Sequence, residues 1–187
     1  IIISGKDIVR ESGVAVTRVT VQTTVEPKAD SFTFVVANAF DLEKREFKWL
    51  DEYFSLGYYV EIRLGYLDQL ETVFYGIITA VRFDYPSGGE MRLIIMGMDI
   101  SFLMMRGIHS ASWKKKKHSE IVREIGSRYL DKFVIDDTKE VIGTVVQKAI
   151  EDFHFITGLA EENNFDFFIV GRTLYFRKPL KDKKPVI

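Results

Sequence analysis

Apolar side chains recur at every second position in several short segments of the first hundred residues, and this two-residue period is the feature that most restricts the fold. Within residues 58–66, one face of an extended chain would carry Tyr58, Val60, Ile62, Leu64 and Tyr66. The opposite face would carry Glu61 and Arg63, among others. Alternation of this kind is typical of a β-strand that buries one face. We therefore expect a strand over residues 58–66.

The same period predicts further strands within residues 14–25, 31–36, 72–83 and 90–97. Turn-forming residues separate the first two of these strands at 26–30 and the last two at 85–89. Residues 42–54 are charged and aromatic, and they predict a long loop or one short helix. Gly76 interrupts its strand and predicts a bulge or a bend at a barrel corner. Because no long helix intervenes, these strands favour a small antiparallel barrel or sandwich.

The spacing of apolar residues becomes helical in the second half of the chain. Residues 119–130 predict a helix with Ser119 as its N-cap. Residues 151–163 predict a second helix that ends at Asn163-Asn164, since asparagine tolerates the left-handed cap conformation. The buried stripe of this helix would consist of Phe155, Ile156, Leu159 and Ala160.

A strand and a hairpin complete the second half. Residues 144–149 predict a short strand, and Gly171-Arg172 predicts a two-residue turn between the strands of a hairpin. The helical stripe must cover the apolar face of this hairpin. We therefore expect Tyr175 to share one core with the stripe residue Leu159.

Length and composition favour two small domains. The 187 residues suit one large domain or two small ones, and 47% hydrophobic residues are enough for packed cores. We expect a β-barrel domain over residues 1–107 and an α+β domain with two helices and a C-terminal hairpin over residues 108–187. The expected fold class is thus a β barrel plus α+β. The longest apolar runs are far too short to cross a bilayer.

The second predicted helix carries residues that resemble catalytic groups, yet each has a simpler structural role. Asp152 at its start would be stabilised by unpaired backbone N–H groups and the helix dipole. His154 lies off the apolar stripe and is expected to be solvated or paired at the surface. Glu161 and Glu162 would form a solvated face.

The sequence predicts no catalytic, cofactor-binding or metal-binding residue. It contains no cysteine, which excludes disulfides and thiolate metal sites. His109 and His118 are nine positions apart in a predicted loop, and no histidine pair has the spacing of a zinc site. Nucleophile-elbow and phosphate-loop motifs are absent. We therefore expect a protein that is not an enzyme and that has no cofactor.

One charge run, Lys114 to Lys117, interrupts an otherwise neutral chain with a net charge of −1. That net charge provides no global field to recruit nucleic acid or an anionic membrane, so we expect neither as a partner. The simplest interpretation of the run is a solvated loop before a helix. Contact with phosphate or lipid, or with an acidic partner protein, stays open as an alternative.

Two segments resemble phage tail baseplate hub proteins of the late-control-protein-D type, a family related to the N-terminal part of type VI secretion spike proteins. The first segment matches the pattern Phe-x-Gly-x-Ile, turn, apolar strand, Gly-x-Asp, Leu at Phe74, Gly76, Ile78, Gly97, Asp99 and Leu103. The second matches at Gln147, Glu151, Asp152, Phe155, Ile156, Leu159, Ala160, Glu161, Glu162, Phe165, Leu174, Tyr175 and Phe176. Ile156 and Asn164 depart from the usual Leu and Gly. The resemblance covers roughly residues 55–107 and 115–178.

This resemblance implies a fold and a function. The fold would be a small antiparallel split barrel followed by an α/β unit. The protein would be a baseplate hub that adapts the tail tube to the central spike, as a homotrimer in its full-length form. Its place would be a virion tail or tail-like particle, synthesised and assembled in the bacterial cytoplasm. An alternative is a cell-wall or carbohydrate-associated enzyme domain on a tail tip, since 27 acidic residues allow many carboxylate pairs.

Overall fold

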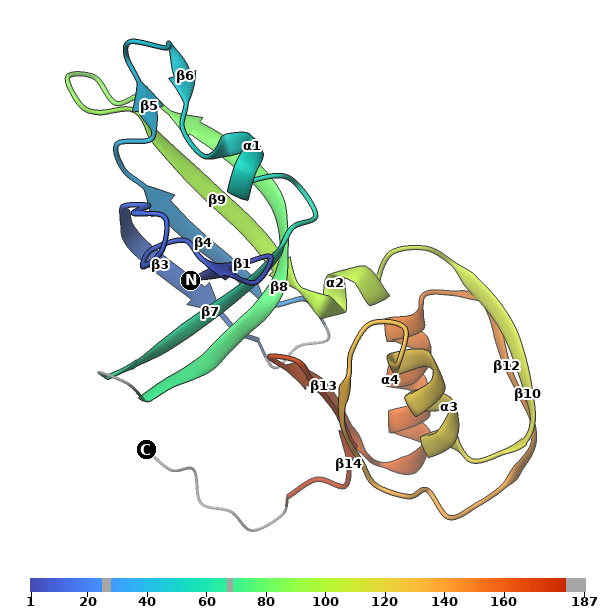
Figure 1. The fold of residues 1–187 in the computed structure, drawn as a ribbon. Helices are drawn as coiled ribbons and strands as arrows, with labels where there is room; N and C mark the ends of the chain where they lie inside the picture. Colours follow the sequence, from blue (N-terminus) through green and yellow to red (C-terminus); the bar gives the residue numbers. More distant parts are fainter. Residues whose placement is uncertain (25–27, 67–68, 181–187) are drawn as a thin grey trace. The chain divides into compact units, whose positions relative to one another are not determined.

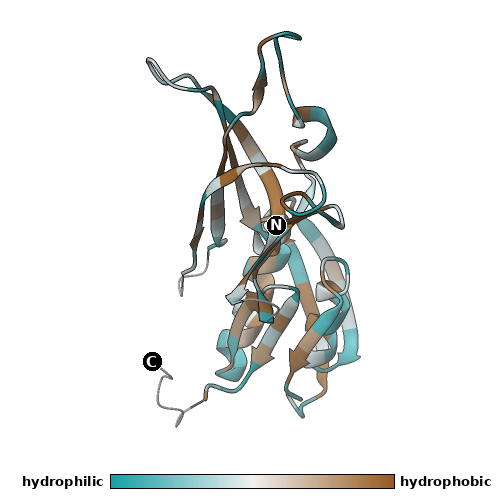
Figure 2. Cartoon of the chain, turned by 60° about the vertical axis from the view of Figure 1, so that its left-hand side comes forward, coloured by the Kyte–Doolittle hydropathy of each residue, from teal (hydrophilic) through white to brown (hydrophobic). Residues whose placement is uncertain are grey.

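The computed structural model describes residues 1–24, 28–66 and 69–180, and it divides into two compact units, Ile1–Ile100 and Ser101–Ile187 (Figure 1). Each unit has its own secondary structure. Figure 2 shows hydrophobic residues along the strands of both units.

In the described part of the first unit, seven strands form one antiparallel sheet that curls into a half-barrel (Figure 1). The strands are β1 (Ile2–Ile3), β2 (Lys6–Asp7), β3 (Val16–Gln22), β4 (Ser31–Val36), β7 (Tyr59–Tyr66), β8 (Gln69–Asp84) and β9 (Arg92–Asp99). Their order across the sheet is β2-β1-β7-β8-β9-β4-β3. The strands predicted from the two-residue period are confirmed. The turn predicted at 26–30 lies partly outside the described residues.

The concave face of the half-barrel holds the core of the first unit. Alternate residues of the central strands are buried there, including Phe32, Phe34, Ile62, Phe74, Ile78, Leu93 and Ile95. A small hairpin, β5 (Phe40–Asp41) and β6 (Glu46–Phe47), and the one-turn helix α1 (Leu50–Tyr53) follow β4. Residues 42–54 thus contain the predicted short helix, but the pattern did not predict the hairpin, whose strands are only two residues long.

Two glycines bring β8 and β9 together. A Cβ atom on Gly76 would lie 2.1 Å from the carbonyl oxygen of Met98, and one on Gly97 would lie 2.1 Å from that of Ile77. Gly76 pairs in register with Val60. Register shifts of β8 lie on both sides of Gly76, between Thr72 and Phe74 in the pairing with β7 and between Ile78 and Ala80 in the pairing with β9, so the bulge predicted at Gly76 itself is misplaced. Gly76 is needed because the neighbouring backbone approaches closely.

The second unit has three layers (Figure 1). Its strands are β10 (His109–Lys116), β11 (Lys132–Ile135), β12 (Ile142–Ile150), β13 (Asp166–Val170) and β14 (Thr173–Arg177). β10 and β12 form an antiparallel ribbon, and the other three form a sheet in the order β11-β14-β13. The helices α3 (His118–Gly126) and α4 (Asp152–Asn163) contact both the ribbon and the sheet. A short helix, α2 (Ile100–Met104), precedes the ribbon in the chain.

The core of the second unit lies between the helices and the three-stranded sheet. It contains Ile121, Val122, Ile125, Phe153, Ile156, Leu159, Ala160, Ile169, Leu174 and Phe176. The two-residue turn at Gly171-Arg172 is confirmed, and Asn164 ends α4 with a φ of 53°. The predicted strand at 144–149 is confirmed as part of a longer β12.

The expected place of Tyr175 in this core is wrong. Tyr175 pairs with Val134 and Phe168 in register, and it stacks on Phe168 on the face of the sheet opposite Leu174 and Phe176. A shift of one residue along a strand moves a side chain to the other face, so the hairpin buries its even-numbered neighbours instead.

Candidate functional site

The carboxylate of Asp152 is the most polar group buried in the second unit, with 0% of the residue exposed. Its Oδ1 accepts a hydrogen bond from Gln147 Nε2 at 2.7 Å. Its Oδ2 accepts hydrogen bonds from Tyr129 Oη at 2.8 Å and from Arg128 Nη1 at 3.2 Å. His109 Nδ1 lies 3.1 Å from Oδ1. We refer to these five residues as the Asp152 cluster.

Local irregularities of the ribbon bring these groups together. The register between β10 and β12 shifts between His109 and Ala111, which places His109 opposite Ile150, next to the start of α4. Ala149 has a φ of 46°, and its N–H donates to Ser110 Oγ. Gln147 Nε2 also donates to the carbonyl oxygen of Ile150 at 3.0 Å. The amide therefore ties the end of β12 to the first residue of α4.

Hydrogen-bond donors surround the carboxylate of Asp152. A buried carboxylate is costly unless cations and hydrogen-bond donors compensate it, and Arg128, Tyr129 and Gln147 do so here. Burial, together with the hydrogen bond to Asp152, raises the pKa of Tyr129 to about 12. The phenol is therefore a donor at neutral pH and is not available as a base.

The geometry of the Asp152 cluster does not favour catalysis. A His–Asp pair becomes a catalytic dyad when the histidine also contacts a nucleophile. Among the described residues, no hydroxyl group donates a hydrogen bond to His109, and the nearby Ser110 Oγ is occupied by Ala149 N–H. Asp152 is sealed from solvent. The cluster instead joins β10, the residues after α3, β12 and α4.

The predicted role of Asp152 as a capping group is wrong. The N-cap residue of α4 is Glu151, and no side chain caps the helix by a hydrogen bond. Asp152 accepts its hydrogen bonds from the side chains of Arg128, Tyr129 and Gln147, because it is buried among them. Gln147 and Asp152 were both singled out by the family resemblance, but Arg128 and Tyr129 carry no signal in the sequence, since they come from a separate segment.

The other acidic and imidazole groups of α4 are at the surface, as predicted. His154 is half exposed, and its Nδ1 lies 3.4 Å from Glu151 Oε2. Glu161 and Glu162 are exposed.

The two remaining histidines are not in a loop, contrary to the prediction. His109 begins β10, and His118 is the buried first residue of α3. His118 Nδ1 lies 2.8 Å from Asn163 Nδ2, and Nε2 lies 3.8 Å from Glu162. Ser119 is also inside α3, whose N-cap is Lys117. Within residues 1–24, 28–66 and 69–180, no three His, Asp or Glu side chains are grouped to hold a metal ion.

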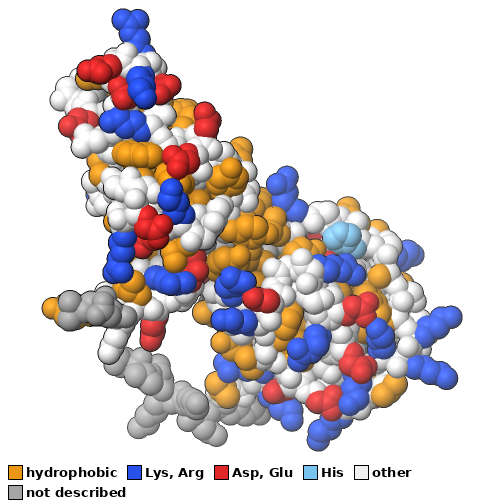
Figure 3. Space-filling model, viewed as in Figure 1, with side chains coloured by type: hydrophobic (Ala, Val, Ile, Leu, Met, Phe, Trp, Pro, Cys, Tyr) orange, Lys and Arg blue, Asp and Glu red, His pale blue; other side chains and the backbone are white. Residues whose placement is uncertain are grey.

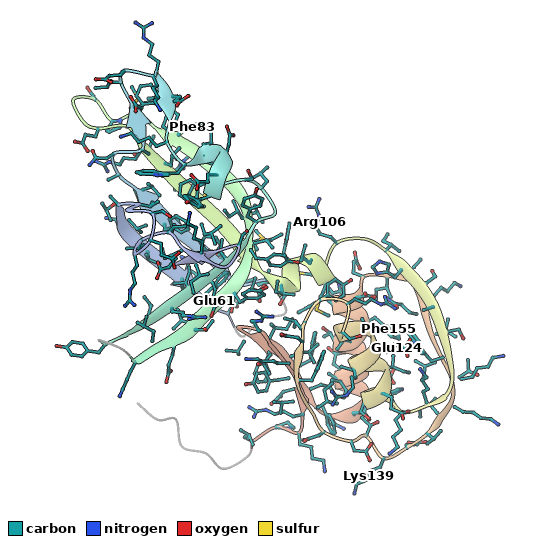
Figure 4. The ribbon with its side chains drawn as sticks, viewed as in Figure 1. Glu61, Phe83, Arg106, Glu124, Lys139 and Phe155 are labelled. Carbon is teal, nitrogen blue, oxygen red and sulfur yellow. The ribbon has the colours of Figure 1, made fainter. Side chains whose placement is uncertain are left out.

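The lysine run forms a strand and not the predicted loop. Lys114 to Lys116 belong to β10 because Trp113 beside them points inward and the backbone pairs with β12. Trp113 stacks on Phe155, and its Nε1–H donates to Glu124 (both labelled in Figure 4). Lysines on an unpaired strand edge also hinder pairing with another chain.

Two of the four lysines are neutralised within the second unit. Lys116 Nζ pairs with Glu124, and Lys117 Nζ lies 2.9 Å from Asp137 Oδ1. These hydrogen bonds hold the pKa values of both carboxyl groups below their ordinary values. Lys114 and Lys115 are exposed, in agreement with the solvated interpretation of the run. Figure 3 shows lysine and arginine side chains along this side of the second unit.

Two hollows on the described surface are lined by residues outside the Asp152 cluster. One of about 430 Å³ lies over α3 and β11, beside Glu120, Arg123 and Asp137. Another of about 450 Å³ lies in the first unit beside Phe54 and Val81. In the part of the chain that is described, no helix is both long and apolar enough to span a membrane.

Comparison with known proteins gives one family and several solved structures. The family model described as the Alg8 N-terminal domain matches residues 1–187. No curated protein matches the sequence. Among solved structures, the 43 kDa tail protein of prophage MuSo2 from Shewanella oneidensis matches with a TM-score of 0.71 and 13% identity, over 90% of this chain and 53% of that chain.

Two further structures match over 90% of this chain. The tail protein from Neisseria meningitidis MC58 has a TM-score of 0.64 and 16% identity, over 47% of that chain. The E. coli c3393 protein, described as a type VI secretion component with structural similarity to the T4 tail proteins gp27 and gp5, has a TM-score of 0.56 and 12% identity, over 51% of that chain. The resemblance to tail hub proteins is thus confirmed at the level of the fold. The chain spans about half the length of these proteins.

Proposed function

The chain belongs to the family described as the Alg8 N-terminal domain, and from its fold we propose that it is a structural component of a phage tail or tail-like contractile injection machine. The observation that carries this proposal is the structural match to two tail proteins and a type VI secretion component over 90% of the chain, a length that includes residues of both units. Fold alone does not determine function. The tail-hub motifs around Gly76 and Asp152 support the same assignment independently.

Within such a machine, we assign the protein the role of a baseplate hub between the tail tube and the central spike. The full-length protein acts as a homotrimer, with the tube and spike proteins as its partners. Residues 1–107 form the hub-type domain and residues 108–187 the α+β domain. The place of action is the tail particle, after assembly in the bacterial cytoplasm.

The role is architectural and not catalytic. The most strongly paired polar groups, those of the Asp152 cluster, are used to join secondary-structure elements and are closed to substrate. The alternative of a tail-tip enzyme domain would need an accessible pair of carboxylates beside a substrate cleft. The hollow over α3 is lined by three exposed carboxylates, those of Glu120, Glu124 and Asp137. Each of them accepts a hydrogen bond within the unit: Glu120 from Lys117 N–H, Glu124 from Trp113 and Lys116, and Asp137 from Lys117 Nζ. This pairing supports a structural use of these carboxylates.

The mass of the full-length protein in solution tests the proposal. The complete reading frame is expressed and its mass is measured by light scattering coupled to size exclusion. We expect three copies, and co-elution with the tube and spike proteins of the same particle. A full-length protein that stays monomeric at tens of micromolar contradicts the hub role. Hydrolysis of peptidoglycan by the 187-residue chain, abolished by one Asp or Glu substitution, contradicts the architectural role.

A further inference from the structure

One hairpin of the first unit leaves the sheet. β1 pairs with β7 only at Val60 and Glu61, and the pairing of β9 with β8 begins at Gly76. Residues 63–66 and 69–72 therefore pair only with each other. We refer to these two segments as the arm. Figure 1 shows β7 and β8 continuing together away from β9.

The core-facing side of β7 continues along the arm without a cover. Val60 and Ile62 are 0% exposed, but Leu64 and Tyr66 on the same face are 51% and 82% exposed. Side chains at alternate positions share a face, so one continuous apolar stripe passes from the core into solvent. Exposed apolar surface of this kind, at the end of a projecting hairpin, is typical of a contact site.

The arm also carries an unpaired charge on that face. Glu71 stands opposite Leu64 in the register, is exposed, and forms no ion pair with any described residue. The exposed face of the arm is thus apolar and acidic.

The convex face of the same sheet has the complementary composition. One cross-strand row consists of Arg18, Val35, Ile94 and Arg82, read from β3 to β8. Arg92 lies two positions before Ile94 on β9 and therefore on the same face. The three arginines are exposed, and none forms an ion pair within the described residues. Asp84 stands opposite Arg92 in the register and is the one acidic residue among these positions, so three positive charges face one negative charge. Arginines around apolar side chains are characteristic of the energetic centres of protein interfaces.

We propose that the arm of one copy docks on the convex face of a second copy, with Leu64 and Tyr66 against the apolar middle of that face and Glu71 among the arginines. The acidic arm and the basic convex face are complementary in charge. Because every copy of the chain carries both surfaces, the partner that fits the arm is a second copy. Because two different surfaces meet, the contact is heterologous, and repetition of it gives a ring or a filament. This inference rests on the proposed hub role, in which copies must associate, and it assigns the surface that they use.

Cysteine cross-linking tests the contact directly, because the native chain has no cysteine to interfere. Thr20, on the convex face two positions after Arg18, and Tyr66 are replaced together (Thr20→Cys, Tyr66→Cys), and the 187-residue chain is oxidised. We expect a ladder of covalent dimers and trimers, since each molecule then offers both partners of a heterologous contact that closes at three copies. Each single variant is expected to give few dimers and no ladder. Oxidation also captures a weak contact.

Charge reversal shows whether the pairing is the proposed one. Glu71→Arg in the double-cysteine chain should reduce the ladder at least several-fold. Reversing the charges on both sides should restore the cross-link in a mixture of two chains. The first chain carries Tyr66→Cys and Glu71→Arg on its arm. The second carries Thr20→Cys on its convex face, where Arg18, Arg82 and Arg92 are changed to Glu. The matched control pairs Tyr66→Cys with Ser112→Cys, an exposed position of the second unit, and should give no ladder.

Three results overturn the interface. They are an absent ladder, a disulfide formed within one molecule, and a ladder that is equally strong in the Ser112→Cys control. If the full-length protein is nevertheless a trimer, the hub role stands and the copies associate through another surface. If the full-length protein is a monomer, the hub role itself fails. Circular dichroism of every variant confirms that it is folded.

Discussion

Replacing Asp152 by asparagine should destabilise the second unit by about 2–3 kcal/mol. Asparagine preserves the shape of the side chain, but it removes the charge and replaces one acceptor oxygen by a donor. Breaking a buried ion pair by changing one partner typically costs about 3–5 kcal/mol.

The expected value lies below that range for reasons visible in the structure. The Arg128 side chain is 43% exposed and turns to water once its partner is neutral, which reduces the loss. Gln147 Nε2 keeps its hydrogen bond to Ile150. The remaining cost arises because two donors, Tyr129 Oη and Gln147 Nε2, would face the new asparagine amide in a sealed site. An unsatisfied buried group of this kind costs about 1–3 kcal/mol.

Urea unfolding followed by tryptophan fluorescence measures the change. Of the two tryptophans in the sequence, Trp49 lies in the first unit and Trp113 in the second. A Trp49→Phe background therefore makes Trp113, stacked on Phe155, the reporter of the second unit. The matched control is Glu161→Gln, the same loss of charge on an exposed residue of α4.

The control variant should change the free energy of unfolding by less than about 0.5 kcal/mol, as surface substitutions usually do. If Asp152→Asn also falls within that limit, the cluster does not hold the elements together and the reasoning above is wrong.

Three further outcomes are expected from single substitutions. Leu159→Ala, at a position only 3% exposed, should cost about 2–5 kcal/mol in urea unfolding; a cost under about 0.5 kcal/mol would place the stripe in solvent. Gly76→Val should lower the melting temperature by forcing β8 from the Met98 carbonyl, whereas Gly143→Val, which meets no atom within 4 Å, should change it little. The raised pKa of Tyr129 means that its stabilising contribution is full below about pH 10 and is lost as pH rises toward 12. The alkaline loss of stability should therefore shrink by about 1 kcal/mol in Tyr129→Phe, after allowance for solvent exposure, and an unchanged pH profile would contradict this.

The strands of the first unit are predictable from the sequence because one face of each is buried and the other is solvated. This contrast produces the two-residue period, as in residues 31–36, where Phe32, Phe34 and Val36 are buried. The strand β10 was missed because its buried residue, Trp113, is followed by four lysines that hide the alternation. The two-residue strands β1 and β2 are too short to show a period.

The Asp152 cluster was only partly predictable. Asp152 and Gln147 lie five positions apart and could be linked by a motif, but Arg128 and His109 come from distant segments and meet them only in the folded unit. The position of Tyr175 was wrong because adjacent apolar residues in 174–176 allow either face to be the buried one. The domain boundary at 107 stays a prediction.

The parallel pairing of β11 with β14 has a consequence for how the protein is made. β14 is the central strand of its sheet, yet it is the last strand among the described residues, whereas β11 is synthesised some forty residues earlier. Because the first unit is compact within Ile1–Ile100, we expect it to fold while its neighbour is still being translated. The second unit must wait for residue 177. A message truncated between these points is therefore expected to give a folded half-barrel with an unfolded tail, which proteases can digest.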